Sequence, residues 1–109
     1  MKELSVRDLV RHCAAHPSTL LLDVRDAWEV QHAALRLPGV AQRHVPVVRI
    51  PDTLGELDPA QPIVCMCHHG VRSLQVVAFL ERHGFESVYN LAGGIDAWSV
   101  QVDPAVPRY

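Results

Sequence analysis

Short runs rich in apolar residues recur along the chain and predict the strands of a sheet. Three of them cover residues 19–24, 63–66 and 88–91. Runs of this length, bounded by turn residues, are typical of buried strands. His44-Val45-Pro46 adds a short extended segment, because a proline biases the residue before it away from the helical region.

The segments between these runs carry apolar residues at helical spacing. Ser5-Val6-Arg7-Asp8 has the spacing of a capping box and predicts a helix with Leu9, Val10 and Cys13 on its apolar face. Gly84 is expected at the position just after the strongest helix. The predicted helices are one from Ser5 that ends before Pro17, a short one after Asp26 that carries Trp28 and Val30, one or two turns within 52–57, the main helix over 73–83 and a short helix over 95–99.

Strands that alternate with helices predict an α/β fold of three layers, with helices on both faces of a central, mostly parallel sheet of about five strands. The 109 residues fit one domain, with a core over about 4–99 and an extended strap over 100–109. Ligands of such sheets bind beyond the carboxyl ends of the strands.

Composition excludes several classes of function. Ten Lys and Arg against twelve Asp and Glu give a net charge of −2, which argues against a nucleic-acid partner held by a basic surface. No run approaches the ~18 apolar residues of a membrane span, and residues 1–5 lack the apolar region of a signal peptide. Three cysteines without paired spacing do not predict disulfides, so a cytoplasmic location is expected.

Cys67 is placed where a thiol becomes reactive. It ends the strand over 63–66, and a turn containing Gly70 leads from it into the helix over 73–83. The first N–H groups of a helix lack backbone partners and carry partial positive charge, so they favour an anion. A thiol in front of them has its pKa lowered from roughly 8.5. Cys67 is therefore the candidate nucleophile.

Four segments, in order, resemble those of the single-domain rhodaneses, a family of sulfurtransferase modules. Residues 21–29 (Leu-Leu-Asp-Val-Arg-Asp-Ala-Trp-Glu) are similar to the family's Asp-Val-Arg-Glu strand end, and His44-Val45-Pro46 to its His-Ile-Pro segment. Residues 67–73 (Cys-His-His-Gly-Val-Arg-Ser) are similar to its active-site loop. Residues 90–98 (Asn-Leu-Ala-Gly-Gly-Ile-Asp-Ala-Trp) are similar to its Leu-x-Gly-Gly-x-x-x-Trp motif.

The resemblance implies a mechanism and a set of site residues. Cys67 would take a sulfane sulfur from a small anionic donor, such as thiosulfate, or from a persulfide, and pass it to a thiol acceptor, without a cofactor or a metal. This is covalent catalysis in two steps. The residues implied around Cys67 are the loop members His68, His69, Gly70, Val71 and Arg72, whose amides would cradle the sulfur, and the supporting Asp23, Arg25 and Ser73. Arg72 would point beneath the loop or toward the substrate, and Asp23 and Arg25 would brace the loop.

The sequence departs from the family pattern at two places. His68 and His69 stand where many members carry a charged or small polar residue, which removes a permanent positive charge and weakens the case for efficient use of the thiosulfate dianion. Both histidines would still gain charge at mildly acid pH. In addition, residues 38–40 precede His44-Val45-Pro46 with a different spacing from the family's.

Other residues with reactive or aromatic side chains are expected to be structural. Cys65 lies two residues before Cys67 on a strand, so both side chains share a face; a buried thiol is favoured over a resolving cysteine. Cys13 is expected in the core. Cys65, Cys67, His68 and His69 could be considered as metal ligands, but four ligands within five residues are too crowded for one tetrahedral site. The remaining expectations are packing roles for Trp28 and Trp98, a structural ion pair between Asp23 and Arg25, and no specific partner for His32 and His44.

Two other functions remain open. Cysteine-dependent phosphatases and some arsenate reductases also place Cys and Arg on a loop before a helix, but with five residues between them, whereas four separate Cys67 from Arg72. A shorter loop suits one sulfur atom better than a tetrahedral phosphate. A domain that binds partners or senses oxidants without catalysis is the other alternative, since a low-pKa thiol oxidises readily.

Overall fold

The computed structural model describes residues 2–109, and five parallel strands form its centre. In chain order these are β1 (Lys2–Leu4), β2 (Leu20–Asp23), β3 (Ala41–His44), β4 (Ile63–Met66) and β5 (Val88–Leu91). Across the sheet the order is β1-β5-β4-β2-β3. All residues of β4, the central strand, are buried, as expected for a strand covered on both faces.

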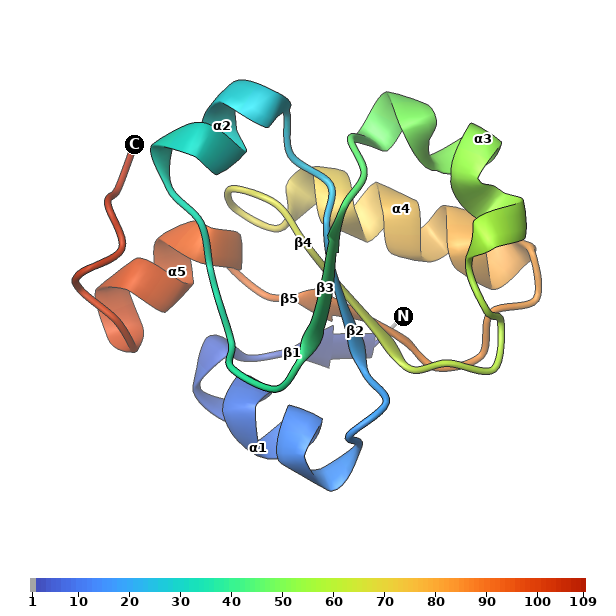
Figure 1. Cartoon of the computed structure of the whole chain (residues 1–109), viewed down its shortest axis with the longest axis horizontal. Helices are drawn as coiled ribbons and strands as arrows, with labels where there is room; N and C mark the ends of the chain where they lie inside the picture. The colour runs from blue at the N-terminus through green and yellow to red at the C-terminus, as the bar shows by residue number, and fades with distance from the viewer. Residues whose placement is uncertain (1) are drawn as a thin grey trace.

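Helices cover both faces of the sheet, as Figure 1 shows. The elements are η1 (Val6–Asp8), α1 (Leu9–Ala15), α2 (Ala27–His32), η2 (Val47–Arg49), α3 (Ile50–Thr53), η3 (Leu54–Glu56), α4 (Val71–Arg82) and α5 (Gly94–Gln101), where η denotes a 3₁₀ helix. Side chains of α3 and α4 pack on one face with Leu22 and Cys65. Those of α1 and α5 pack on the other with Leu21 and Val64. The α/β fold with a parallel sheet is therefore confirmed.

The parallel arrangement brings the carboxyl ends of all five strands to one edge of the sheet. Asp23 of β2 is level with His44 of β3 and Met66 of β4. The segments that follow these strands therefore begin side by side: Arg25 leads into α2, Val45 into η2, and Cys67 into α4. Residues 21–29, 44–46 and 67–73, which are far apart in the sequence, thus meet at this edge.

The first helix differs from its prediction. It begins as the single turn η1, and the Ser5 hydroxyl donates to the Asp8 carboxylate (3.1 Å) instead of capping a backbone N–H. Val10 is 56% exposed, so its predicted place on the apolar face is wrong. Val6, Leu9 and Cys13 form the buried face, because an interval of three or four residues returns to the same side of a helix.

Four further features differ from what the sequence predicted. β1 was not predicted because Lys-Glu-Leu has no apolar run. This strand belongs to the sheet through its parallel backbone pairing with β5. The main helix α4 begins at Val71 rather than Ser73, and α5 continues to Gln101, into the predicted strap. Trp98 is buried as expected, but Trp28 is 62% exposed and is not a core residue. Gly84 follows α4 with a φ of +89°, which confirms its predicted role.

Candidate active site

Cys67 lies directly after β4 and before α4, so the predicted setting of this thiol is confirmed. The loop from Cys67 to Gly70 returns the chain into the helix, and Gly70 has a φ of +96°, which favours glycine. A Cβ at Gly70 would also lie 3.2 Å from the Gly93 nitrogen. Cys67 is 1% exposed, so its sulfur lies at the bottom of the loop and is accessible only to a small reacting group.

The sulfur of Cys67 is surrounded by hydrogen-bond donors. The Gly70 amide donates to it at 3.1 Å and the Ser73 amide at 3.4 Å, while the Ser73 hydroxyl lies at 3.3 Å. Burial by itself raises the pKa of the thiol. The Ser73 hydroxyl and the amides of Ser73, Gly70 and Arg72 outweigh burial and hold the pKa of Cys67 below its ordinary value. The thiolate is therefore favoured, as a nucleophile requires.

A chain of hydrogen bonds couples this sulfur to β5. The Ser73 hydroxyl lies 2.5 Å from Oδ1 of the buried Asn90, whose Nδ2 donates to the Gly70 carbonyl at 3.0 Å. A hydroxyl has one proton to donate. The Ser73 hydroxyl donates to Asn90, so the Cys67 thiol can donate to Ser73. Donation from Ser73 to a thiolate would require the hydroxyl proton to turn from Asn90 to the sulfur. Asn90 was not predicted as a site residue.

The start of α5 fixes the position of the loop backbone. The Ile95 amide donates to the Cys67 carbonyl (3.0 Å), and the Asp96 amide donates to the His68 carbonyl (3.1 Å). This contact requires Gly94, because a Cβ there would collide with both carbonyl groups and its φ is +62°. The Gly-Gly pair of residues 90–98 is thus explained by the close approach of two backbones.

Arg72 turns toward α2 and forms an ion pair with Glu29. Its Nη1 and Nη2 lie 2.6 Å and 2.9 Å from Glu29 Oε1 and Oε2. Hydrogen bonds from Arg72, with a smaller contribution from the Tyr109 hydroxyl, overcome burial and lower the pKa of Glu29 from 4.5 to about 2. Glu29 was not singled out by sequence, although Asp26-x-x-Glu29 has the spacing of a capping box and forms one.

Asp23 and Arg25 form the expected ion pair, but they do not bond to the loop backbone. Arg25 is fully buried, and its Nη2 lies 2.7 Å from Asp23 Oδ2. Nη1 of Arg25 donates to the Tyr109 hydroxyl at 2.9 Å. His44, for which no partner was expected, bonds through Nε2 to the Arg25 carbonyl at 2.6 Å. The pair is thus linked to the site through Tyr109.

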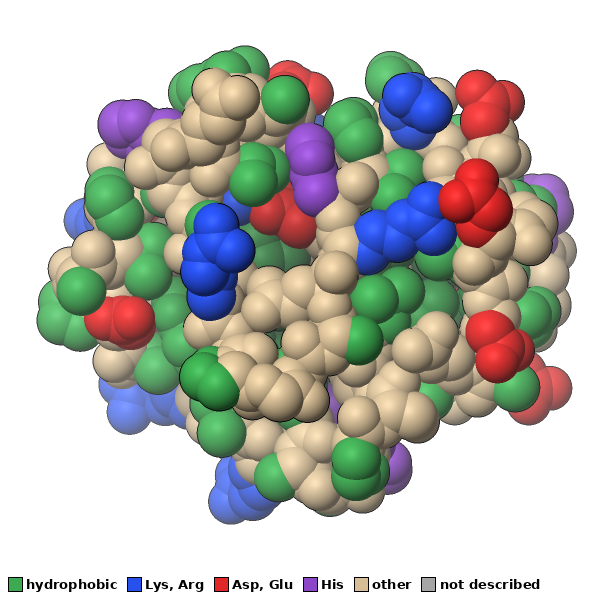
Figure 2. Space-filling model, in the orientation of Figure 1, with side chains coloured by type: hydrophobic (Ala, Val, Ile, Leu, Met, Phe, Trp, Pro, Cys, Tyr) green, Lys and Arg blue, Asp and Glu red, His purple; other side chains and the backbone are tan. Residues whose placement is uncertain are grey.

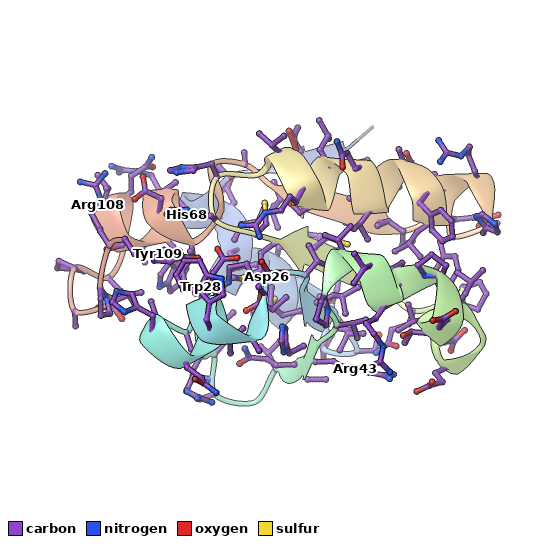
Figure 3. The ribbon with its side chains drawn as sticks, turned by 90° about the horizontal axis from the view of Figure 1, so that it is seen from above. Asp26, Trp28, Arg43, His68, Arg108 and Tyr109 are labelled. Carbon is purple, nitrogen blue, oxygen red and sulfur yellow. The ribbon has the colours of Figure 1, made fainter. Side chains whose placement is uncertain are left out.

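Tyr109 lies among aromatic side chains from two elements, and nothing in the sequence pattern indicated it. Its ring stacks on His68 with 3.9 Å between ring centroids and 7° between planes, and His68 stacks in turn on His69. Trp28 of α2 meets the Tyr109 ring edge-on. Figure 3 shows Tyr109, His68 and Trp28 gathered at one end of the molecule. Burial, together with the charge of His69, lowers the pKa of His68, so its protonation requires more acid conditions than expected.

The remaining cysteines are buried, as predicted. Cys13 and Cys65 are buried, and burial raises the pKa of both thiols. Among residues 2–109, no three His, Cys, Asp or Glu side chains are grouped so that they could share a metal ion. Nor does this part of the chain contain a helix of the length and apolarity that crossing a bilayer requires.

A cavity of about 190 Å³ lies beside the edge strand β3, on the face of the molecule that Figure 2 presents. Asp23, Arg36, Arg43, His44 and Met66 contribute to its lining. Cys67 and the other loop residues do not. The cavity therefore borders the Asp23–Arg25 ion pair rather than the candidate nucleophile.

The fold and the site together are those of an α/β protein with a buried cysteine after a central strand, in a loop whose backbone amides donate to its sulfur. The family model described as a rhodanese-like domain matches residues 5–101, and the chain therefore belongs to the rhodanese-like domain family. The resemblance seen in the sequence is confirmed.

Relatives and solved structures agree with this assignment. A protein of Allochromatium vinosum named sulfurtransferase is 31% identical over 99 residues, covering 91% of this chain and 89% of that protein. The rhodanese-like/PpiC domain-containing protein 12, chloroplastic, of Arabidopsis thaliana is 40% identical over 93 residues, which are 82% of this chain but 30% of that protein. The structure of a rhodanese-like domain protein from Staphylococcus aureus superposes with a TM-score of 0.79 at 27% identity, covering 100% of this chain and 99% of that one.

Proposed function

We propose that the protein is a sulfurtransferase in which Cys67 carries the transferred sulfur as a persulfide. The observation that carries this proposal is the sulfur of Cys67 at the start of α4, with the amides of Gly70 and Ser73 donating to it. The same N–H donors would stabilise the negative charge of a persulfide, since N–H groups at a helix N-terminus favour anions. Relatives named sulfurtransferases support the same reaction class.

The reaction divides into two nucleophilic displacements. In the first, the Cys67 thiolate attacks the outer sulfur of thiosulfate; a sulfur–sulfur bond to Cys67 forms, the bond to the sulfonate breaks, and sulfite leaves with the electron pair. In the second, an acceptor thiolate attacks the outer sulfur of the persulfide. The acceptor becomes the persulfide, and Cys67 is released as the thiolate. A persulfide donor would serve the first step in the same way, with its thiolate as leaving group.

Arg72 would bind the anionic part of the donor. Two of its five N–H groups are used by Glu29, and its side chain is 36% exposed, so the others remain available. The Glu29 carboxylate cancels part of the positive charge, and a dianion therefore gains less here than at an unpaired arginine. We propose that persulfides and other singly charged donors are used at least as well as thiosulfate.

All three cysteines are free and buried, and burial raises the pKa of the Cys13 and Cys65 thiols. Free thiols fit a reducing compartment. We accordingly propose a cytoplasmic location. The whole chain would act as one functional domain, with its core over about residues 4–99. The acceptor would be a small thiol or a protein thiol.

Intact-mass spectrometry tests the proposal. The protein is incubated separately with thiosulfate, inorganic polysulfide and a low-molecular-weight persulfide, and the mass is read before and after reduction. We expect a gain of one sulfur atom with at least one donor, reversed by a thiol and absent in Cys67→Ser. Cys13→Ala is the matched control because Cys13 is buried away from the loop. Absence of the adduct with every donor, or its persistence in Cys67→Ser, would refute the proposal.

The phosphatase alternative is disfavoured by the size of the loop. A tetrahedral phosphate needs several amides around it. Only four residues separate Cys67 from Arg72, and the amides of Gly70 and Ser73 in this small loop donate to the Cys67 sulfur. Turnover of an aryl phosphate by the wild-type protein, lost in Cys67→Ser, would favour the alternative instead.

A further inference from the structure

Tyr109 lies outside residues 5–101, which match the rhodanese-like domain, yet it contacts the candidate site. The segment after α5 is held in place by specific contacts. The Ser99 hydroxyl donates to the Val106 carbonyl at 2.6 Å, and Val106 is buried against the core. Arg108 forms an ion pair with Asp96 at 2.9 Å. These contacts return the chain to the carboxyl edge of the sheet.

The hydroxyl of Tyr109 lies between two buried side chains of opposite charge. It accepts from Arg25 Nη1 at 2.9 Å and donates to Glu29 Oε2 at 2.7 Å. Arg25 is 0% exposed and Glu29 is 3% exposed, so their attraction is weakly screened by water. Burial raises the pKa of Tyr109 to about 12, and its hydroxyl therefore keeps its proton at neutral pH.

This bridge determines what Glu29 is free to bind. Arg72 approaches Glu29 from one side and uses both carboxylate oxygens. Arg25 approaches from the other side but reaches the side chain of Glu29 only through the Tyr109 hydroxyl. If the hydroxyl is removed, the two buried charges face each other without a group between them. Arg25 then competes with Arg72 for the same carboxylate.

We propose that Tyr109 is a positioning residue of the Cys67 site: its hydroxyl separates Arg25 from Glu29, so that Glu29 holds Arg72 in the orientation that receives an anionic reactant. The significance of this role for sulfur donors rests on the proposed function. The contacts that join Arg25, Tyr109, Glu29 and Arg72 do not depend on that function. Stacking on His68 keeps the Tyr109 ring in place when the hydroxyl is absent.

Alkylation of Cys67 by two reagents of similar size tests the role of the Tyr109 hydroxyl without sulfur transfer. Iodoacetate is an anion and iodoacetamide is neutral; with both, the thiolate forms a bond to carbon and iodide leaves. We expect Tyr109→Phe to lower the rate with iodoacetate by about three- to tenfold, because charge attraction changes such rates by factors of this size or more. The rate with iodoacetamide is expected to stay within about twofold, since the thiolate itself is unchanged.

Tyr89→Phe is the matched control, because Tyr89 carries the same hydroxyl but lies on β5, against Lys2 and His12. It should leave both rates unchanged. Equal losses with both reagents in Tyr109→Phe would show a purely structural role, and no loss with either would show no role. A faster reaction with iodoacetate would show that the Glu29 pairing weakens anion binding by Arg72 rather than supporting it. Each of these results overturns the inference. The Arg72 side-chain N–H signals in NMR spectra give a second measurement: they should broaden in Tyr109→Phe, and unchanged signals would also overturn it.

The sulfur reaction then separates the two proposals. If the wild-type protein forms a persulfide, Tyr109→Phe should lower kcat/KM for thiosulfate, and it should do so through a higher KM. If no donor loads the wild-type protein, the proposed function fails, and the alkylation rates alone still decide the role of Tyr109.

Discussion

Replacement of Glu29 by glutamine is the most informative perturbation of this site. Both oxygens of Glu29 accept from Arg72, and Oε1 also accepts from the Asp26 amide while Oε2 accepts from Tyr109. A glutamine keeps the shape but has one NH₂ group. Whichever way it is turned, that NH₂ faces an N–H of Arg72, so one donor opposes another in a buried place.

The size of the effect follows from the pKa of Glu29. Its folded-state pKa is lowered from 4.5 to about 2, so the ionised form stabilises the native state above about pH 4.5. At about 1.4 kcal/mol per pH unit, the difference amounts to about 3 kcal/mol. The loss of one partner from a buried ion pair costs about 3–5 kcal/mol, which agrees with this value. Because Arg72 is partly exposed, we expect a loss of stability at the lower end of that range. The contribution is lost as pH falls from about 4.5 to about 2.

Urea unfolding of the wild type and Glu29→Gln, followed by circular dichroism from pH 7 to pH 2, measures this contribution. We expect the variant to be less stable by about 3 kcal/mol at pH 7 and the two proteins to converge near pH 2. Other carboxylates titrate equally in both proteins and cancel in the difference. A variant as stable as the wild type at pH 7, or a difference that does not change with pH, would refute this account of the Arg72–Glu29 pair.

Two further substitutions test the sulfur and its loop. Ser73→Ala removes a hydroxyl that favours the thiolate, so the pKa of Cys67 should rise; the midpoint of the alkylation rate against pH would move upward, and an unmoved midpoint would contradict the role of Ser73. Gly94→Ala places a Cβ against the carbonyl groups of Cys67 and His68 at a φ of +62°, and should lower the free energy of unfolding by at least about 2 kcal/mol. Chemical denaturation measures this loss, with Gly55→Ala as control because the Cβ there meets nothing within 4 Å.

The alternation of strands and helices could be read from the sequence because it depends on neighbouring residues. The buried strand β4 and the helix α4 each have a local pattern, and together they located Cys67. Where the local pattern was weak, prediction failed. Val10 was assigned to the wrong face of a short helix, and Trp28, for which a core or packing role was predicted, is largely exposed and packs only against Tyr109 among the aromatic rings near it.

The sequence by itself thus determined most of the helices and strands, their order and the position of the candidate nucleophile at the end of a strand, since each follows from contiguous residues; β1 was the strand that it missed. Only the tertiary structure decided which groups surround that nucleophile. Arg72 meets Glu29 across 43 positions, and Tyr109 meets the same carboxylate across 80. Such pairs depend on how parallel strands align their ends and on where the segment after α5 returns. These are consequences of packing between distant segments, on which local patterns carry no information.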